Sequence, residues 1–257
     1  MAEPLLRVEG VCKRFGGLLA LDNASFIAET GRITALIGPN GAGKTTLFAI
    51  IAGFSPPSRG RIFYAGADIT GEPPYLLARR GIARTFQTAQ PFAGLSVQDN
   101  IAVGSYLQHP ARSDARAAAG EIAREVGLGD YLGRPAASLT VSALKRLELA
   151  RALAINPRLL LLDEVIAGLN PSEIRDIVPL ILAIRARGTT IVLIEHVMQA
   201  VMSLAEQVLV LAEGRIIAQG APQAIAANPR VIEAYLGQGA AQRAAGERPG
   251  KLRLPRR

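Results

Sequence analysis

Short apolar runs alternate with amphipathic segments along this chain, and the alternation predicts a mostly parallel β-sheet with helices on its faces. Because the expected helices fall between expected strands, the fold class is α/β. Strands are expected at residues 32–37, 159–162, 190–194 and 207–211. Helices are expected to begin at Lys44, near Pro171 and after His196.

The strand expected at residues 159–162 consists of four leucines without any polar alternation. A run of this kind fits a central strand that is buried on both faces of a sheet. A buried helix is the alternative. Asp163 and Glu164 follow the run directly, which favours a strand that ends at a functional site.

Between residues 88 and 155 the pattern becomes helical, most clearly at 111–126 and 143–155. We interpret this stretch as a helical subdomain that is inserted into the α/β core. The chain shows no internal repeat with a period of roughly 20 to 50 residues, and this excludes a solenoid.

Composition indicates a globular chain without a membrane span. About half of the 257 residues are hydrophobic, which is enough for a substantial core. The apolar stretches, such as residues 177–184, are far shorter than the roughly 20 residues that cross a bilayer. Cys12 is the single cysteine and the first residues lack a secretion-signal pattern, so we expect a reducing cytoplasmic environment.

The formal charge of +8 is unevenly distributed. Residues 238–257 hold six basic side chains against one acid, which leaves +3 for the rest of the chain. We expect this segment to be a basic, disordered tail, with contact to anionic lipid headgroups as the alternative. Because the excess is concentrated there, the charge gives little support to nucleic-acid binding, and no nucleic-acid partner is expected.

Residues 38–45 read Gly-Pro-Asn-Gly-Ala-Gly-Lys-Thr and match the Walker A pattern between an expected strand and an expected helix. Glycines let backbone amides turn toward a phosphate, and the following helix adds its positive end. Lys44 is expected to contact the β- and γ-phosphates of ATP and Thr45 to bind Mg²⁺. The residues assigned to nucleotide binding in this segment are Gly38, Pro39, Asn40, Gly41, Ala42, Gly43, Lys44, Thr45 and Thr46.

The two carboxylates after the leucine run complete the expected site. Asp163 is positioned to hold Mg²⁺ through water, and Glu164 to polarise the attacking water. Ligands of such sheets bind at the carboxyl ends of the strands, which is where both residues fall. The alternative, a turn or helix cap, is disfavoured by the phosphate loop upstream.

With these residues assembled, the chain resembles the ABC ATPase family over its length to about residue 237. The likeness is greatest to the ATP-binding subunits of branched-chain amino acid importers. It implies an ABC-type P-loop NTPase core with an N-terminal antiparallel β portion, a domain at 1–237 and a tail at 238–257. The sequence segments that carry the resemblance are Phe-Gly-Gly at 15–17, Ala-Arg-Thr-Phe-Gln at 83–87, Ala-Gly-Leu-Asn-Pro at 167–171, Ile-Glu-His at 194–196 and Glu-Ala-Tyr-Leu-Gly at 233–237.

The resemblance implies further roles. Phe15 would stack on adenine, with ordinary core packing as the alternative. Gln87 would sense Mg²⁺ and the attacking water while its loop faces the membrane partner. His196 would contact the γ-phosphate, and Asn170 would lie in the loop that crosses to a second subunit. His109 has no such context and is expected to be a loop residue.

The signature sequence departs from the family pattern. The family's usual serine, glycines and glutamine are replaced here, and only a hydroxyl survives, at Thr140. Ser142 adds a Cβ where a backbone amide would approach a partner's γ-phosphate, so the site to which this chain lends its signature should be weakened. The residues concerned are Leu139, Thr140, Val141, Ser142 and Ala143.

Three interpretations of this departure stay open. We favour a heterodimer in which a second ABC ATPase subunit with a complete signature closes over this chain's phosphate site. A homodimer would carry the defect in both sites. A drifted, poorly active relative is the third, because Val165 and Val197 stand where proline and aspartate are frequent in the similar subfamily.

The resemblance implies an ATP-hydrolysing importer subunit that couples dimer closure to transport of branched-chain or related amino acids. Its partners would be two membrane permease subunits and, indirectly, a solute-binding protein. Its place would be peripheral, on the cytoplasmic face of the inner membrane. An exporter ATPase for lipid or lipopolysaccharide and a weakly hydrolytic regulatory subunit are the alternatives.

Overall fold

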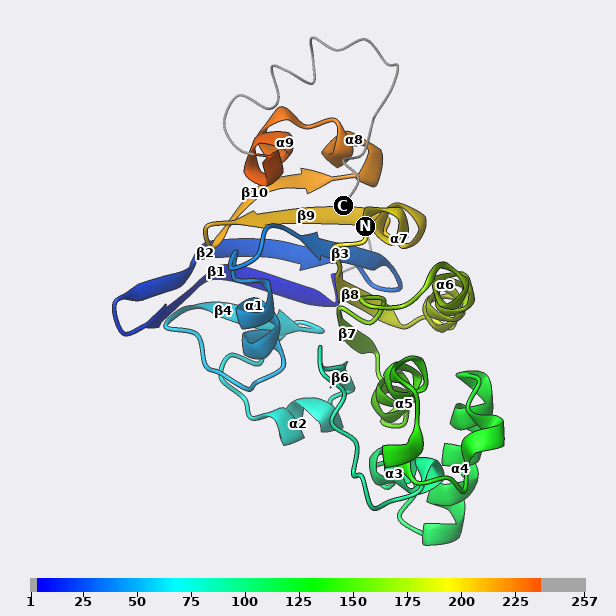
Figure 1. The fold of residues 1–257 in the computed structure, drawn as a ribbon. Helices are drawn as coiled ribbons and strands as arrows, with labels where there is room; N and C mark the ends of the chain where they lie inside the picture. Colours follow the sequence, from blue (N-terminus) through cyan, green and yellow to red (C-terminus); the bar gives the residue numbers. More distant parts are fainter. Residues whose placement is uncertain (1–3, 237–257) are drawn as a thin grey trace.

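A computed structural model describes residues 4–236 of the chain, which form two sheets with helices around them (Figure 1). The smaller sheet is antiparallel and has the strand order β2-β1-β4-β5. It provides the N-terminal antiparallel portion that the sequence predicts. Its strands are β1 (Leu6–Phe15), β2 (Leu18–Ala28), β4 (Arg59–Tyr64) and β5 (Ala67–Asp68).

The larger sheet has the order β10-β9-β3-β8-β7-β6 and is parallel except for the β9–β10 pair. The predicted strands at 32–37, 159–162, 190–194 and 207–211 are all confirmed. The strands of this sheet are β3 (Ile33–Ile37), β6 (Ile82–Arg84), β7 (Leu159–Asp163), β8 (Thr190–Ile194), β9 (Gln207–Ala212) and β10 (Arg215–Gly220).

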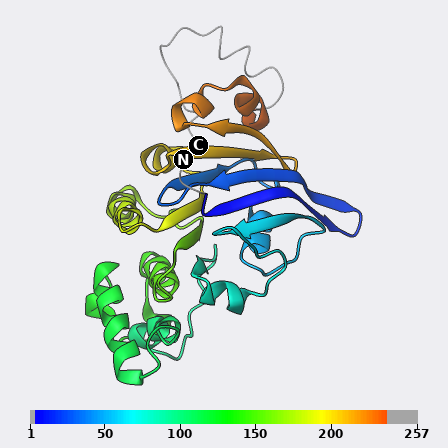
Figure 2. The same cartoon turned by 180° about the vertical axis from the view of Figure 1, so that it is seen from behind.

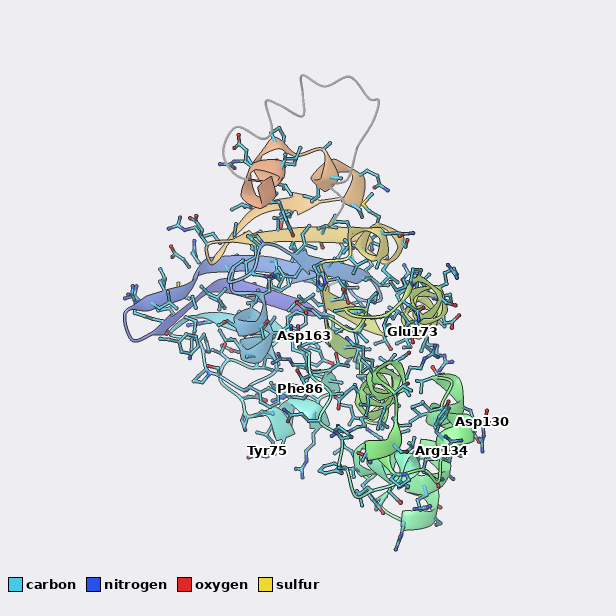
Figure 3. The ribbon with its side chains drawn as sticks, viewed as in Figure 1. Tyr75, Phe86, Asp130, Arg134, Asp163 and Glu173 are labelled. Atoms are coloured by element: carbon cyan, nitrogen blue, oxygen red, sulfur yellow. The ribbon has the colours of Figure 1, made fainter. Side chains whose placement is uncertain are left out.

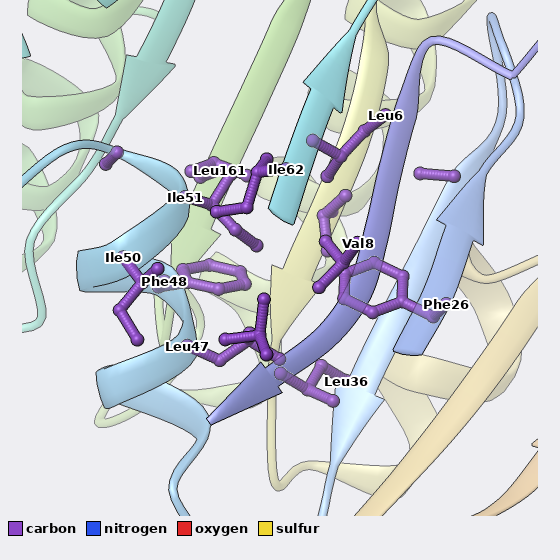
Figure 4. Packing of buried hydrophobic residues seen from close by; sticks show 14 of the residues in the cluster. Leu6, Val8, Phe26, Leu36, Leu47, Phe48, Ile50, Ile51, Ile62 and Leu161 are labelled. Carbon is purple, nitrogen blue, oxygen red and sulfur yellow. The ribbon is translucent and has the colours of Figure 1, made fainter. Parts of the chain in front are cut away.

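The leucines of β7 are buried on both faces of the sheet, as the absence of polar alternation predicts. Leu159 and Leu161 pack with α1 (Lys44–Ile51) and the antiparallel sheet, whereas Leu160 and Leu162 belong to a second core. This second core contains α6 (Pro171–Ala186) and α7 (Met198–Leu204). Figure 4 shows the first core, in which Phe48 of α1 lies among side chains from both sheets.

Helices occupy the region where the sequence predicts them, and they have a hydrophobic core of their own. We call α3 (Val97–Ser105), α4 (Arg112–Glu125) and α5 (Val141–Leu153) the helical region. Figures 1 and 2 both show α3 and α4 at the end of the molecule opposite α8 (Pro222–Ala226) and α9 (Pro229–Leu236). His109 lies in the loop between α3 and α4, as expected.

Smaller elements complete the described chain. They are α2 (Pro74–Arg79) and two 3-10 turns, Gly129–Tyr131 and Ala136–Ser138. Within residues 4–236, none of the helices has the length and apolar character that a membrane span requires. The basic tail predicted at 238–257 lies outside the described residues, so the division of the chain at residue 237 stays a prediction.

Packing around Phe48 generates a stability prediction. Its side chain is fully buried, so Phe48→Ala should lower the free energy of unfolding by about 3–5 kcal/mol, from lost transfer energy and the remaining cavity. Tyr75 is 64% exposed, and Tyr75→Ala should stay within about 0.5 kcal/mol of the parent. Urea unfolding of the three proteins checks this, and equal losses for the two variants would contradict it.

Candidate nucleotide site

The phosphate loop runs from the end of β3 to the start of α1 and fits closely against two other backbone segments. A Cβ on Gly38 would collide with the carbonyl oxygen of Leu211, and one on Gly43 with the carbonyl oxygen of Ala20. Gly43 also has a φ of 103°. Only glycine meets both requirements, so these positions are fixed by tertiary packing as well as by the need to approach a phosphate.

Lys44 folds back over the loop. Its Nζ donates to the carbonyl oxygens of Gly38 at 2.7 Å and Pro39 at 2.9 Å. Burial lowers the pKa of Lys44, and the nearby carboxylates of Glu164 and Asp163 oppose that shift. The ammonium group is thus held at the mouth of the loop, where a phosphate oxygen can replace the carbonyls as its acceptor.

Asp163 ends β7 with a side chain that is only 1% exposed. Its Oδ2 accepts a hydrogen bond from Arg84 Nη2 at 2.8 Å, and its backbone amide donates to Thr85 Oγ1 at 3.0 Å. Burial raises the pKa of Asp163, while the Arg84 guanidinium opposes the rise. The remaining oxygen, Oδ1, is buried and has no hydrogen-bond partner within residues 4–236.

This free oxygen fits a magnesium ligand. Mg²⁺ is usually held by one or two carboxylates together with water and substrate phosphates, not by a cage of protein side chains. Residues 4–236 contain no cluster of three or more His, Cys, Asp or Glu side chains that could hold a metal ion. A single buried carboxylate beside the phosphate loop is the arrangement expected for a nucleotide-bound ion.

Glu164 has a left-handed backbone, with a φ of 50°. This conformation costs a non-glycine residue on the order of 1–3 kcal/mol and is found mostly where a side chain must be held in a particular direction. Lys145 Nζ donates to the Glu164 carbonyl oxygen at 2.7 Å, and the Glu164 amide donates to the Ile194 carbonyl at 3.0 Å. The strained conformation is therefore held from two sides.

The Glu164 carboxylate lies between two of the predicted site residues. Gln87 Nε2 donates to its Oε2 at 2.8 Å, and His196 Nδ1 lies 3.9 Å from its Oε1. The structure thus brings together Gln87, Glu164 and His196, which are far apart in the sequence. The carboxylate is accessible enough to reach a water molecule, because its side chain is 20% exposed.

Phe15 lies in the open cleft next to the phosphate loop and not in the core. Its ring is 51% exposed, which rules out the core-packing alternative. The cleft has a volume of about 730 Å³ and is also lined by Asn40 to Thr46, Gln87 and Glu164. A flat aromatic ring at one end of a phosphate-binding cleft is suited to stack on a nucleobase.

Two predicted residues have local roles that the sequence interpretation did not include. Thr140 caps α5, where its Oγ1 accepts from the Ala143 amide at 3.3 Å. Asn170 caps α6 through a reciprocal capping box with Glu173. A contact between Asn170 and a second subunit stays a prediction.

In the signature segment, Leu139 and Thr140 have extended backbones, and α5 begins at Val141. Ser142 is not among the described residues that have a positive φ. Its backbone conformation therefore does not require glycine. The expected effect of Ser142 therefore rests on its Cβ alone. Ala143 is buried in the core of the helical region, where it packs as a small apolar residue. Leu139 is buried in the same core, whereas Val141 is exposed.

Sequence reasoning gave no role to Arg84, Lys145 or Glu195. Glu195 is 1% exposed, and its Oε1 accepts from the Ile166 amide at 2.8 Å. Burial raises the pKa of Glu195 to about 7, although that hydrogen bond and Lys145 both oppose the rise. The position of Glu195 directly after β8 was the available signal, since polar residues at that edge of the sheet face the site.

Glu195 generates a prediction about stability and pH. Its folded pKa of about 7 lies above the ordinary 4.5, so the folded state holds a proton that the unfolded state loses as pH rises. The free energy of unfolding therefore falls as pH rises from 4.5 to about 7, by at most about 1.4 kcal/mol per pH unit. Glu195→Gln should remove this pH dependence. Between pH 5 and 8, the free energy of unfolding of the variant should therefore rise by about 2.5 kcal/mol relative to that of the parent. Denaturant unfolding at several pH values measures this, and parallel profiles would contradict it.

Comparison with known proteins agrees with this geometry. The family described as ABC transporter matches residues 21–167, and the one described as Branched-chain amino acid ATP-binding cassette transporter matches residues 215–241. The chain is 39% identical to the high-affinity branched-chain amino acid transport ATP-binding protein BraF of Pseudomonas aeruginosa, over 93% of this chain and all of that protein. It is 34% identical to a probable branched-chain amino acid transport ATP-binding protein LivG of Methanocaldococcus jannaschii, over 91% and 98%.

Solved structures give the same result for the fold. A nucleotide-free ATP-binding cassette from an ABC transporter is 32% identical, with a TM-score of 0.84 over 92% of this chain and all of the other. The ADP conformation of another such cassette is 33% identical, with a TM-score of 0.83 over the same shares. Phosphate loop, buried Asp163, fold and sequence agree: the chain belongs to the ABC transporter family as an ATP-binding subunit with ATPase activity.

Proposed function

We propose that this chain powers the import of branched-chain or chemically related amino acids, by hydrolysing ATP in a dimer that is coupled to a membrane permease. ABC ATPase subunits work with permease partners, and the curated relatives described above are named for branched-chain amino acid transport. The observation that carries the hydrolytic part is the arrangement around Glu164, in which the carboxylate is held by Gln87 and faces the phosphate loop.

The chain's own residues bind and orient ATP. The amides of residues 38–46 and the N-terminus of α1 hold the phosphates, and the Lys44 ammonium binds the terminal ones. Phe15 stacks on the adenine. Thr45, Gln87 and Asp163 would hold Mg²⁺, which would supply positive charge next to the phosphates. This assignment is supported by the unpartnered Oδ1 of Asp163 and by the common cleft of the other residues.

Hydrolysis requires a water molecule aligned with the γ-phosphate. Glu164 accepts a hydrogen bond from that water and takes its proton, and Gln87 fixes the direction of the carboxylate. His196 contacts the γ-phosphate, so this contact forms only when that phosphate is bound. His196 Nδ1 lies 3.9 Å from Glu164 Oε1. At this distance, a change in the charge or position of one group alters the electrostatic energy of the other.

The surface next to Gln87 is suited to a permease segment. Phe54 and Phe86 are both exposed, and their rings pack edge to face with centroids 5.5 Å apart. They border a cleft of about 250 Å³ that also contains Arg84. Pro74 and Ala78 of α2 line the same cleft, and Figure 3 shows Phe86 and Tyr75 in this part of the molecule. Arg84 also binds Asp163, so a segment docked here would contact the nucleotide site through one side chain.

The dimer is proposed to be asymmetric. A second ABC ATPase subunit with a complete signature would close over this chain's phosphate loop, while Thr140 and Ser142 would serve the weaker site. A homodimer is the alternative. The proposed place of the assembly is the cytoplasmic face of the inner membrane, where a solute-binding protein acts indirectly through the permease.

The proposed hydrolysis depends on Glu164. Glu164→Gln keeps the contact with Gln87 but removes the proton acceptor, so ATP hydrolysis by the assembled complex should fall by about 100-fold or more while ATP binding persists. Phosphate release and nucleotide binding are measured on the same preparations. Glu121→Gln, on an exposed face of α4, serves as the matched control. Hydrolysis by the assembled complex that does not depend on Glu164 would refute the role.

The asymmetric dimer makes a second prediction. Ser142→Gly should raise hydrolysis by the chain paired with itself by about ten-fold, because it removes the Cβ that hinders an amide donor. In a complex with a partner whose signature is complete, the same substitution should leave hydrolysis at this chain's own phosphate loop unchanged. Assays with a partner disabled at its own catalytic glutamate isolate that site. A large change there would contradict the asymmetry.

A further inference from the structure

A second cleft lies between the helical region and the sheet, away from the nucleotide. Its volume is about 590 Å³, within the range of about 300–1,000 Å³ that is usual for small-molecule sites. It is lined by Arg158, just before β7, and Thr189, just before β8, so it lies at the amino ends of these strands. The nucleotide site lies at their carboxyl ends, roughly 16 Å away along five residues of strand. We call it the hinge cleft.

Two polar side chains of the hinge cleft have hydrogen-bonding capacity that the described residues do not use. Ser105 is fully buried, and its Oγ has no hydrogen-bond partner in the described part of the chain. Glu125 Oε1 is also buried without a partner, whereas its Oε2 accepts from Arg187 Nη1 at 2.7 Å. Buried polar groups without partners are costly, and they mark a position where a ligand with donors would be stabilised.

The charges at the hinge cleft come from opposite sides. Glu125 belongs to α4, Arg187 follows α6, and Arg158 precedes β7. The lining of the hinge cleft thus includes the guanidinium groups of Arg158 and Arg187 and the carboxylate of Glu125. One oxygen of this carboxylate already binds Arg187. Burial raises the pKa of the Tyr64 hydroxyl, and Arg158 lies near enough for its charge to oppose that rise. A ligand that carries both a carboxylate and an ammonium group would offer an acceptor to Arg158 and a donor to Glu125 Oε1.

The rest of the wall is aliphatic. The hinge cleft is also lined by Ile122 of α4, Leu153 of α5 and Ile184 of α6. Ile184 is 2% exposed and forms part of the second core. An aliphatic side chain placed against these residues would be stabilised by the removal of its apolar surface from water.

We propose that the hinge cleft binds an α-amino acid with an aliphatic side chain. Its carboxylate pairs with Arg158, its ammonium donates to Glu125 Oε1 and Ser105 Oγ, and its side chain packs on Ile122, Leu153 and Ile184. Because these residues come from the helical region, from α6 and from the segment before β7, an occupied cleft restrains movement of the helical region relative to the larger sheet. That the transported solute would thereby regulate its own import rests on the proposed function, whereas the binding does not.

The test is calorimetric titration of the purified full-length chain with L-leucine. Binding should be saturable and should persist in Lys44→Ala, which locates it away from the phosphate loop. It should weaken by about ten-fold or more in Glu125→Gln, because a charge-assisted hydrogen bond is lost. Glu121→Gln is the matched control, since Glu121 lies one turn earlier on α4, pairs with Arg124 and does not line the cleft.

A second ligand tests the proposed orientation. The compound 4-methylpentanoate has the carboxylate and side chain of leucine but no ammonium group. It should bind the parent chain about ten-fold more weakly than leucine, and Glu125→Gln should not weaken it further. Equal binding of both compounds would make the cleft a simple anion site and overturn the proposal, as would the absence of saturable leucine binding.

Failure of this inference is distinguishable from failure of the proposed function. Leucine binding is measured on the isolated chain without nucleotide or permease, whereas the proposed function is judged by Glu164-dependent hydrolysis in the assembled complex. A chain that hydrolyses ATP in the complex but does not bind leucine would overturn only the hinge-cleft proposal. Glu125→Gln should retain Glu164-dependent hydrolysis, and its loss would assign Glu125 to the catalytic machinery and overturn the separate role.

Discussion

The parallel pairing of β3, β8 and β7 brings three distant parts of the chain to one edge of the sheet. Leu36 pairs with Ile194, and Ile194 pairs with Asp163, so the three strands end at nearly the same level. The phosphate loop, His196 and Glu164 leave the sheet from these ends. A shift of one residue in the register would turn Asp163 to the opposite face, because successive strand residues point in opposite directions.

Burial at this edge of the sheet makes it costly to keep the carboxyl groups of the site charged. Asp163 and Glu195 are both almost fully buried, and burial raises the pKa of each. Arg84 compensates the first, and Lys145 is near the second. In such an environment each charge interacts more strongly than it would in water, so the position of one side chain alters the protonation and direction of its neighbours.

The helix α5 connects the nucleotide site with the rest of the helical region. Near its start, Lys145 holds the Glu164 carbonyl oxygen, and at its end, Leu153 lines the hinge cleft. The same helix begins with the signature segment, which Thr140 caps. A packed helix moves as a unit, so a displacement of the helical region would be transmitted to the backbone of Glu164 through this one element.

The sequence by itself determined the main strands, the helices at Lys44 and Pro171 and the phosphate loop, because these features depend on local hydrophobic pattern and on glycine spacing. Residue type also placed Asp163 and Glu164 at the end of a buried strand. Only the tertiary structure decided that Gln87 binds Glu164, that Arg84 binds Asp163, and that Phe15 is exposed in the cleft. It also decided the desolvation of Glu195 and the existence of the hinge cleft, whose lining comes from several separate segments. Such contacts join residues that are distant in the chain, and their burial depends on how whole elements pack, which no local pattern encodes.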